Sequence, residues 1–583
     1  MRCPEVLEGE DDGLEGGGHF RYFDFAQYKF TISDFGFTNY ALRIMKTPLS
    51  RLSNWFIPFI LLLSLGGLLR LIDITDEPLD FQPSRQLRNS LVAREIYYSV
   101  LPSATEEQKL LSQTFADSVG KYEPPVIESI VAYSYFLTGA ENIAVARVWL
   151  TLFWLIAGIA LFDLMKRVVS PWSALIALSF YLVLPFSVQA SRSFQPDPLM
   201  TSAFVIGIYF LYRWSEEISN EKASWKFAIL AGIFLGFATF VKIVIAFFVG
   251  AAAIALVLFT LGKNFWKSKQ VWTMAALMVV PALVFYVFLN QGRSTEYFFS
   301  WTVALINLIT STDFYTKWLA FLGTLFGLTV IFLSIAGALI ASPRMRWLTI
   351  SLWIGYLLYG LTLPFQMYTH SYYHIQLIPI LALGLAVVLN PLVESVSTQG
   401  GVRSAGFIAL IVAVIGYQAY VARSVLVAED FRHEPAFWSE VGEAIPSDGN
   451  VMALTQDYGY RLMMYGWRRV SLWPLATGLS EARNPDKNNA EQFAELTDDM
   501  DNLLRSTDVG TIFLDRDLLI RKFTPRIAHA FQLLPQDIGR RIDSFAHNIL
   551  HDGLLDDVRR VLETAEPIER DEWVPDTHAH RMM

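Results

Sequence analysis

Cysteine and charged side chains are both scarce in this chain of 583 residues. The single cysteine, Cys3, excludes an intrachain disulfide and a cysteine-based zinc site. Charged residues make up 17% of the chain, against about 25% in average soluble domains. Hydrophobic residues reach 53% and the mean hydropathy is +0.36, which excludes intrinsic disorder and argues against a purely soluble protein. The net charge of −9 gives no sign of a nucleic-acid partner.

Long apolar stretches recur along most of the chain. A membrane span needs about 20 mostly apolar residues, and the aromatic content of 14% fits a chain with many membrane interfaces. The pattern predicts a polytopic α-helical membrane protein, in which Lys242 divides the apolar stretch 226–262 into a helical hairpin. Eleven spans are predicted, near residues 54–72, 145–165, 172–190, 198–213, 226–241, 243–262, 271–290, 318–341, 347–364, 375–393 and 404–424.

The basic residues of the short loops set the orientation, because cytoplasmic loops carry an excess of lysine and arginine. With the N-terminus inside, eleven basic residues fall in inner loops and four in outer ones. We therefore expect a multi-pass protein of the plasma (inner) membrane with a cytoplasmic N-terminus and an external or periplasmic C-terminal domain. The inner set is Lys166, Arg167, Arg213, Lys222, Lys226, Lys263, Lys267, Lys269, Arg344, Arg346 and Arg403, and the outer set is Arg192, Lys242, Arg293 and Lys317.

Three regions follow from this map. Residues 1–53 form a cytoplasmic N-terminal segment that we expect to be disordered, with Met45 as an alternative start before the leader MKTPLSRLSNW. Residues 54–424 form a transmembrane domain that includes a long external loop at 73–144. Residues 425–583 contain no apolar run long enough to span a membrane, and hold 17 basic against 28 acidic residues.

The C-terminal region alternates between two kinds of pattern. Helical segments are predicted at 435–445, 459–466 and 490–506. Between and after them stand the strand-like stretches NVMALT, VSLW and TIFLD. This order predicts a small external α/β domain.

The first external loop opens with acids and continues with arginines on a predicted helix. Arg85 and Arg88 share one face of that helix through their i,i+3 spacing. A carboxylate here could act as a general base on a hydroxyl, and guanidinium groups could hold a phosphate bidentately. The alternative for each residue is a solvated turn with snorkelling side chains. The acids are Asp73, Asp76, Glu77 and Asp80, and the arginines are Arg85, Arg88 and Arg94.

Four further segments place polar groups on the same external face. Each segment could instead have a purely structural role, as a headgroup anchor, a solvated turn or an aromatic belt. We infer a site because all of these groups lie on the same side of the predicted membrane. His370 and His374 have the i,i+4 spacing of zinc ligands, but a third ligand is not near in sequence, so hydrogen bonding to a sugar or phosphate is the better interpretation. The groups are Arg147 at the entrance of the second span, Asp197 in ASRSFQPDPLM, Lys242 at the hairpin tip, and His370, Tyr372, Tyr373 and His374 in THSYYHI.

This constellation resembles the GT-C superfamily of membrane glycosyltransferases, and within it the bacterial branch related to protein O-mannosyltransferases and aminoarabinose transferases. The resemblance covers roughly residues 54–393. It rests on the acid-bearing first loop, on PP followed by GAENIAVAR, on SRSFQPDPLM and on SYYHIQLIPILAL. No one of these motifs is specific, and their order and spacing carry the resemblance.

The resemblance implies a donor sugar linked to polyprenyl phosphate, an acceptor hydroxyl deprotonated by a first-loop carboxylate, and inversion at the anomeric carbon. The catalytic acid maps to Asp80 or Asp76 and a second acid to Asp197. Many relatives carry an Asp-Glu pair at the start of the loop helix, where this chain has Ser84 and Arg85. That departure leaves Asp80, Asp76 and Asp73 open, with Asp80 ranked first because it is nearest to the arginines. The basic groups for the lipid phosphate map to Arg85, Arg88, Arg147 and Lys242.

Other functions remain open at this stage. A transporter or flippase of a lipid-linked sugar would place polar groups near the bilayer midplane, whereas these cluster at one face. A ligase or polymerase of lipid-linked glycans would share the topology and the chemistry. A noncatalytic receptor fits poorly with the dense acids and bases of the first loop. The sequence requires no cofactor and leaves a divalent cation open, and it leaves open a hexosyl or pentosyl donor and a lipid, glycan or protein acceptor.

Overall fold

The computed structural model describes most of the chain between Trp55 and Leu472, and part of the chain beyond it. The described residues up to Leu472 belong to one compact unit, and those from Ile512 onward belong to a second. The predicted cytoplasmic segment 1–53 lies outside the described residues, and the predicted division at 424/425 stays a prediction. The residues described are 55–472 apart from 121, 221–224, 291–301, 447–450 and 454, and scattered residues between 512 and 561.

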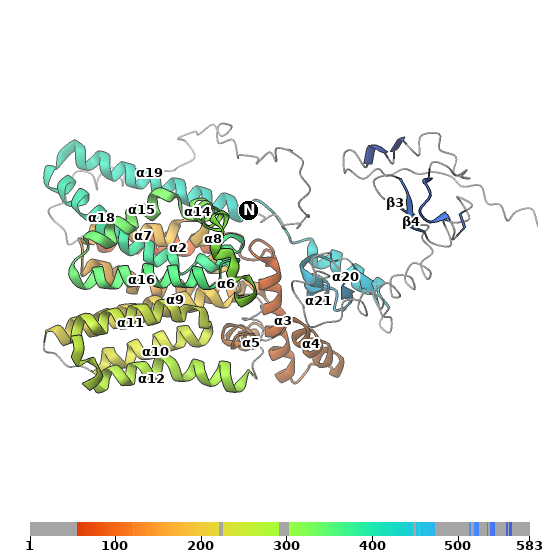
Figure 1. Cartoon of the computed structure of the whole chain (residues 1–583), viewed down its shortest axis with the longest axis horizontal. Coiled ribbons are helices and arrows are strands. Elements are labelled where there is room, and N and C mark those ends of the chain that lie inside the picture. The colour runs from red at the N-terminus through yellow and green to blue at the C-terminus, as the bar shows by residue number, and fades with distance from the viewer. Residues whose placement is uncertain are drawn as a thin grey trace, which may run out of the picture. The chain divides into compact units, whose positions relative to one another are not determined.

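Each predicted span coincides with one helix or with two consecutive helices. The long helices of the bundle lie side by side in Figure 1. Five stretches of the described residues are long and apolar enough to cross a membrane, or up to seven if each bent pair is one span. The chain is therefore a multi-pass membrane protein, and the count of eleven stays a prediction. The helices are α2 (Phe56–Leu71), α6 (Ile143–Lys166), α7 (Pro171–Val183), α8 (Pro185–Arg192), α9 (Pro196–Ser219), α10 (Trp225–Val241), α11 (Ala246–Leu261), α12 (Lys269–Leu283) with the π-helix η5 (Val284–Leu289), α14 (Thr312–Phe326), α15 (Leu328–Ile340), α16 (Pro343–Thr362), α18 (Leu377–Gln399) and α19 (Gly401–Leu426).

Two of the predicted spans are broken. The α7–α8 pair bends by 57° before Pro185, and the α14–α15 pair bends by 95°. Gly327 separates α14 from α15 with a φ of 81°, a left-handed conformation that glycine adopts without strain. The stretch 318–341, expected as one span, is therefore two helices at a steep angle.

Small residues allow some of these helices to approach closely, as in many membrane bundles. A Cβ atom added to Gly384 of α18 would stand 2.3 Å from the carbonyl oxygen of Ser334 on α15. Trp154 of α6 stacks on Tyr181 of α7 at 4.5 Å between ring centroids. The resulting core joins the helices of the bundle into one unit.

A layer of shorter helices lies at one end of the bundle (Figure 1). It consists of α3 (Pro83–Val100), α4 (Glu106–Val119) and α5 (Val126–Thr138), all within the predicted first loop. α4 begins with a capping box between Thr105 and Gln108.

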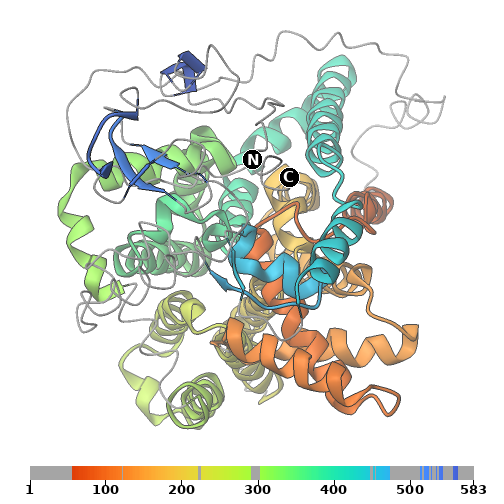
Figure 2. The same ribbon diagram turned by 90° about the vertical axis from the view of Figure 1, so that its right-hand side faces the viewer.

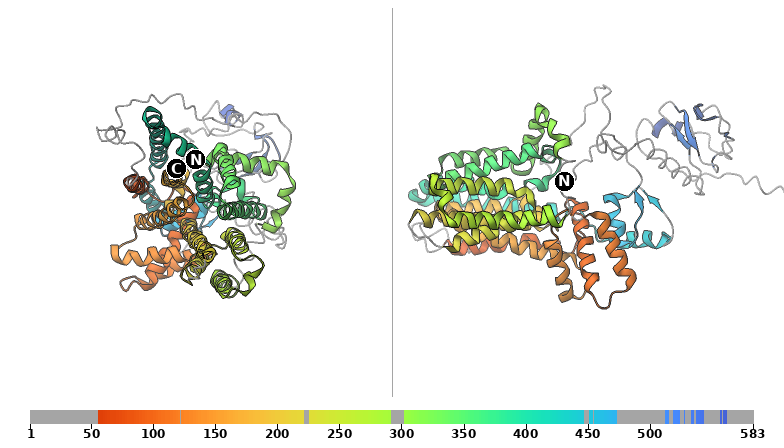
Figure 3. Two further views of the ribbon diagram at one scale, coloured as in Figure 1. Left: turned by 90° about the vertical axis from the view of Figure 1, so that its left-hand side faces the viewer. Right: turned by 60° about the horizontal axis from the view of Figure 1, so that its bottom comes forward.

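The segment after α19 packs on the same layer. It contains α20 (Glu434–Ala444) and α21 (Tyr460–Tyr465), and Figure 2 looks onto the end of the bundle where it lies. Met463 joins Leu91, Val92, Phe115 and Val119 of α3 and α4 in one small hydrophobic core. Figure 3 shows this segment beside α3 and α4 from a second direction.

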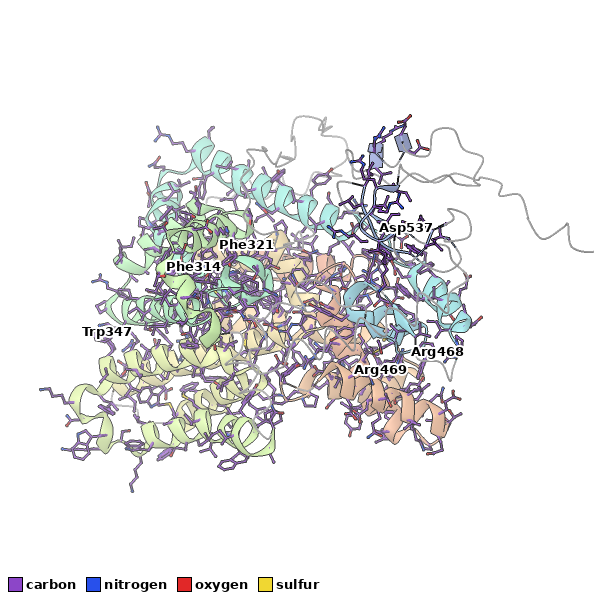
Figure 4. The ribbon with its side chains drawn as sticks, turned by 45° about the vertical axis from the view of Figure 1, so that its right-hand side comes forward. Phe314, Phe321, Trp347, Arg468, Arg469 and Asp537 are labelled. Carbon is purple, nitrogen blue, oxygen red and sulfur yellow. The ribbon has the colours of Figure 1, made fainter. Side chains whose placement is uncertain are left out.

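The two ends of the bundle are distinct. Trp347, near the start of α16, lies at one end, and Arg468 and Arg469 lie at the other (Figure 4). Trp347 is 48% exposed, as an indole at a membrane interface would be. The remaining short helices are η3 (Ile243–Ile245), η4 (Gly262–Lys267), η6 (Val303–Thr310), α17 (Gln366–Thr369), η7 (Ser371–His374) and η8 (Gln456–Gly459).

The C-terminal α/β pattern is confirmed where residues are described. β1 (Met452–Ala453) pairs in parallel with β2 (Ser471–Leu472) in the first unit. β3 (Ile512–Leu514) pairs antiparallel with β4 (Ile520–Phe523) in the second unit, with Ile512 opposite Phe523. The helix expected at 490–506 lies outside the described residues.

Candidate functional site

Asp80 lies between two arginines, Arg147 and Arg192. Its Oδ1 is 3.3 Å from Arg147 Nη2, and its Oδ2 is 2.9 Å from Arg192 Nη2. Gln86 Nε2 donates to Oδ1 at 3.2 Å. Burial alone would raise the pKa of Asp80, but the two guanidinium groups outweigh burial and lower it. The side chain is a paired carboxylate with one-tenth of its surface exposed.

The other three acids at the opening of the first loop contact the segment that follows α19. Asp76 Oδ1 accepts the backbone N–H of Phe431 at 2.9 Å, and Asp73 forms an ion pair with Arg432. Glu77 Oε2 accepts the hydroxyl of Tyr465 at 2.7 Å. Burial raises the pKa of both Asp76 and Glu77, although these hydrogen bonds oppose it. These three acids therefore have protein partners and do not form the solvated turn that was the alternative.

Asp197 and Lys242 form a buried ion pair. Lys242 Nζ lies 2.8 and 2.9 Å from the two carboxylate oxygens of Asp197 at the start of α9. The same Nζ stands 5.2 Å from the ring centroid of Tyr372 and 5.1 Å from that of Tyr373, within the range of cation–π contacts. Three separate segments of the sequence thus meet at one point.

Helix α3 of the first loop packs against the turn before α9. Gln86 Oε1 accepts the backbone N–H of Phe194 and Asn89 Nδ2 donates to its carbonyl, both at 2.8 Å. These bonds fix the turn before α9 against α3. Arg85, one turn along the same helix face as Arg88, donates from Nε to the hydroxyl of Tyr372 at 3.1 Å.

Arg85 and Arg88 both face Glu123. Arg88 Nη1 is 3.3 Å from Glu123 Oε2, and Arg85 Nη1 is 4.0 Å from Oε1. Burial would raise the pKa of Glu123, but Arg88, Arg85 and Lys242 together lower it to about 2. Glu123 is therefore an ionised carboxylate surrounded by three cations.

The two predicted histidines have different environments. His374 is fully buried, with its Nδ1 2.8 Å from the hydroxyl of Tyr356 and its Nε2 3.0 Å from the carbonyl of Met367. Both of its ring nitrogens are thus occupied within the protein. His370 has its Nδ1 2.6 Å from the hydroxyl of Thr369 and its ring 5.5 Å from that of Tyr372. Burial and the charges of Arg85 and Lys242 lower the pKa of His370 to about 4. A neutral imidazole at this position can accept or donate a hydrogen bond.

Arg94 lies apart from the cation cluster. Its guanidinium pairs with Glu141 at 2.9 Å and donates to the carbonyls of Met463 and Met464 at 3.2 and 2.7 Å. It also stands 4.4 Å from the ring of Trp467. The structure thus places Arg94 where it anchors α21 to α3.

Sequence reasoning missed several members of the site. Arg192 appeared only as an outer-loop charge, and Gln86 and Tyr465 carried no signal of their own. Glu123 stands directly before the Pro124-Pro125 pair, and an acid beside a rigid proline pair was the signal available. Across the described ranges, no group of three or more His, Cys, Asp or Glu side chains is arranged to hold a metal ion.

Two family models match parts of this chain. Residues 122–288 match the family described as dolichyl-phosphate-mannose-protein mannosyltransferase, and residues 500–583 match the PAS domain. A curated relative from Rhodobacter capsulatus, an uncharacterized 104.1 kDa protein in the hypE 3′ region, is 34% identical over 73 residues. That match covers 12% of this chain and 8% of the relative, so the chain spans under a tenth of that protein's length.

Solved structures share the architecture of the helical unit. ArnT from Cupriavidus metallidurans in the apo state is 14% identical with a TM-score of 0.50, covering 78% of this chain and 91% of ArnT. The same protein bound to undecaprenyl phosphate is 13% identical with a TM-score of 0.48, covering 78% and 92%. An Archaeoglobus fulgidus oligosaccharyltransferase in complex with zinc and sulfate is 14% identical with a TM-score of 0.41, covering 70% and 61%.

The helical unit is thus a polytopic membrane fold of the GT-C type. The resemblance to the GT-C superfamily of membrane glycosyltransferases, expected from the sequence, is confirmed, with ArnT as a similar fold.

Proposed function

We propose that this protein transfers a sugar from a polyprenyl-phosphate donor to an acceptor hydroxyl at the external face of the plasma membrane. The observation that carries this proposal is the convergence of Arg85, Arg88 and Lys242 at the end of the bundle that also holds the first-loop acids. A cluster of cations beside lipid suits the phosphate of a lipid-linked donor. ArnT, whose apo form shares this fold, has also been solved with undecaprenyl phosphate bound.

The reaction needs a base for the acceptor and a place for the leaving group. The acceptor oxygen would form a bond to the anomeric carbon from the side opposite the phosphate, with inversion. The bond between that carbon and the phosphate oxygen would break. Polyprenyl phosphate would be the leaving group, and the cations would stabilise its negative charge. The acceptor proton would pass to a carboxylate of the first loop.

Asp80 and Asp76 are the two proposed bases, and they differ in electrostatics. Arg147 and Arg192 lower the pKa of Asp80, which weakens it as a proton acceptor while they stay paired with it. Burial raises the pKa of Asp76, which strengthens it. Asp197, paired with Lys242, is proposed to hold the ammonium group of that lysine in place beside the donor.

The remaining predicted residues take supporting roles in this proposal. Tyr372, Tyr373 and His370 would contact the phosphate or the sugar from the side of Lys242. Arg147 would hold the first loop through the carbonyls of Ile74 and Glu77, at 2.9 and 3.2 Å, rather than bind lipid.

The test is an assay with a purified, lipid-reconstituted protein and a set of polyprenyl-phosphate sugars. Release of polyprenyl phosphate that depends on an added glycan, lipid or peptide acceptor would support the proposal. Flipping of the intact donor across the vesicle membrane, with no cleavage in the presence of any acceptor class, would instead indicate a transporter.

A further inference from the structure

The site already contains an anion of its own where the donor phosphate is proposed to bind. The Glu123 carboxylate lies 3.3 Å from Arg88 Nη1 and 4.0 Å from Arg85 Nη1, and it also interacts with the charge of Lys242. Asp197 is the partner of Lys242. Three cations thus share two carboxylates, and the carboxylate shared by both arginines is Glu123.

The two arginines do not depend on Glu123 for their positions. Arg88 also donates from Nη2 to the carbonyl of Gly120 at 3.0 Å, and its guanidinium stands 5.1 Å from the ring of Tyr122. Arg85 is held by the hydroxyl and ring of Tyr372, at 3.1 Å and 5.0 Å. If the carboxylate withdrew, both guanidinium groups would keep other contacts and would still face the same space.

The backbone around Glu123 connects two helices rather than forming part of one. Glu123 lies between the end of α4 and the start of α5, just after Gly120, whose φ is 74°. The side chain of Glu123 is 14% exposed, compared with 8% for that of Arg88. A side chain on such a connection can change rotamer without breaking a helical hydrogen bond.

We propose that Glu123 is a displaceable counter-ion, which neutralises Arg85 and Arg88 in the empty site and yields them to the phosphate of the donor. This inference rests on the proposed function and adds a positioning residue to it. A phosphodiester and a carboxylate each carry one negative charge and offer oxygens to the same guanidinium donors. Exchange of one for the other leaves the charge of the site unchanged, so no buried cation is left unpaired at either stage.

Removal of the Glu123 charge should therefore tighten phosphate binding, whereas removal of a merely structural acid would weaken it or leave it unchanged. The experiment measures the Kd of undecaprenyl phosphate for the full-length protein in lipid nanodiscs, with undecaprenol as the ligand that lacks the phosphate. Glu123→Gln keeps the size of the side chain and removes the negative charge that competes with the phosphate for Arg85 and Arg88. We expect its Kd for undecaprenyl phosphate to fall about tenfold or more, with no change for undecaprenol.

Glu141→Gln is the matched control. It removes the same charge from the same external layer and also breaks an ion pair with an arginine of α3, Arg94. Its Kd should stay within about twofold of the wild-type value, because Glu141 pairs with Arg94 and does not compete with a phosphate for Arg85 or Arg88. A second variant, Glu123→Asp, keeps the charge but withdraws it by one methylene, and we expect a tightening smaller than that of Glu123→Gln.

The outcomes separate this inference from the proposed function. Equal or weaker binding by Glu123→Gln, with undecaprenyl phosphate binding normally to the wild type, would overturn the counter-ion role alone. Equal tightening in Glu141→Gln would overturn it as well, because the effect would then be general electrostatics. Failure of undecaprenyl phosphate to bind the wild type and every variant would overturn both.

Discussion

Lys242 and Asp197 lie 2.8 Å apart as an ion pair in which each side chain is only 5% exposed, although 44 residues separate them in the sequence. Lys242 follows α10 and Asp197 starts α9, and these two helices pack against each other. The pair therefore holds the end of α10 against the start of α9, at the point where Tyr372 and Tyr373 also converge.

Asp197→Asn should destabilise the protein strongly. The change leaves the ammonium group of Lys242 buried without its counter-charge, which typically costs about 3–5 kcal/mol. The measurement is thermal unfolding in detergent, compared with Asp163→Asn in a pair that is nearly a third exposed. Adding Lys242→Met to Asp197→Asn should recover part of the loss. Equal stability of Asp197→Asn and Asp163→Asn would contradict the strong contribution of the buried pair.

The choice of base is tested by turnover rather than by stability. The asparagine variant of the true base, Asp80→Asn or Asp76→Asn, should lower kcat by about 10²–10⁴-fold. Its affinity for the donor should be retained. Because Asp80 is paired with Arg147 and Arg192, its replacement should also lower the melting temperature more than the replacement of Asp73 does. Near-normal turnover in Asp73→Asn, Asp76→Asn and Asp80→Asn alike would remove the first-loop base from the mechanism.

The sequence was informative where a physical pattern is local. Apolar length predicted the helices of the bundle, and the i,i+3 spacing predicted that Arg85 and Arg88 share a face. It could not predict that Arg192 would reach Asp80, because that contact joins residues 112 positions apart in the sequence. The break at Gly327 was also missed, since an isolated glycine within an apolar stretch does not reveal its φ. The pairing of Asp73, Asp76 and Glu77 with residues beyond α19 required the three-dimensional structure.

Arg88 and Arg94 provide a matched pair on one helix. Arg88→Ala should weaken binding of undecaprenyl phosphate by about tenfold or more, because it removes a charge-assisted contact to the phosphate. Arg94→Ala should leave that affinity near the wild-type value and instead lower thermal stability, since Arg94 holds the carbonyls of Met463 and Met464. Both are measured by lipid binding and by melting. Equal losses of affinity in the two variants would place Arg94 in the phosphate site after all.

Orientation is tested with cysteine labelling at exposed sites, in a Cys3→Ser background. Glu107→Cys on α4 and Asn264→Cys in η4 are both on exposed positions, and they stand on opposite sides of the predicted topology. An impermeant thiol reagent should label Glu107→Cys in intact cells and should label Asn264→Cys only after the membrane is opened. The reverse pattern would invert the proposed topology and move the site to the cytoplasm.

Two truncations separate the segment after α19 from the second compact unit. A chain ending near residue 473 keeps the contacts of Phe431, Arg432 and Tyr465 with the first loop, so it should fold and retain the donor site. A chain ending near residue 430 leaves Asp76 and Glu77 without those hydrogen bonds and uncovers the apolar residues that pack on Met463. Because an unsatisfied buried polar group costs about 1–3 kcal/mol, the shorter chain should melt at a clearly lower temperature and lose turnover, as measured by thermal unfolding and by polyprenyl phosphate release. Equal stability and activity of the two chains would show that the acids of the first loop do not need this segment.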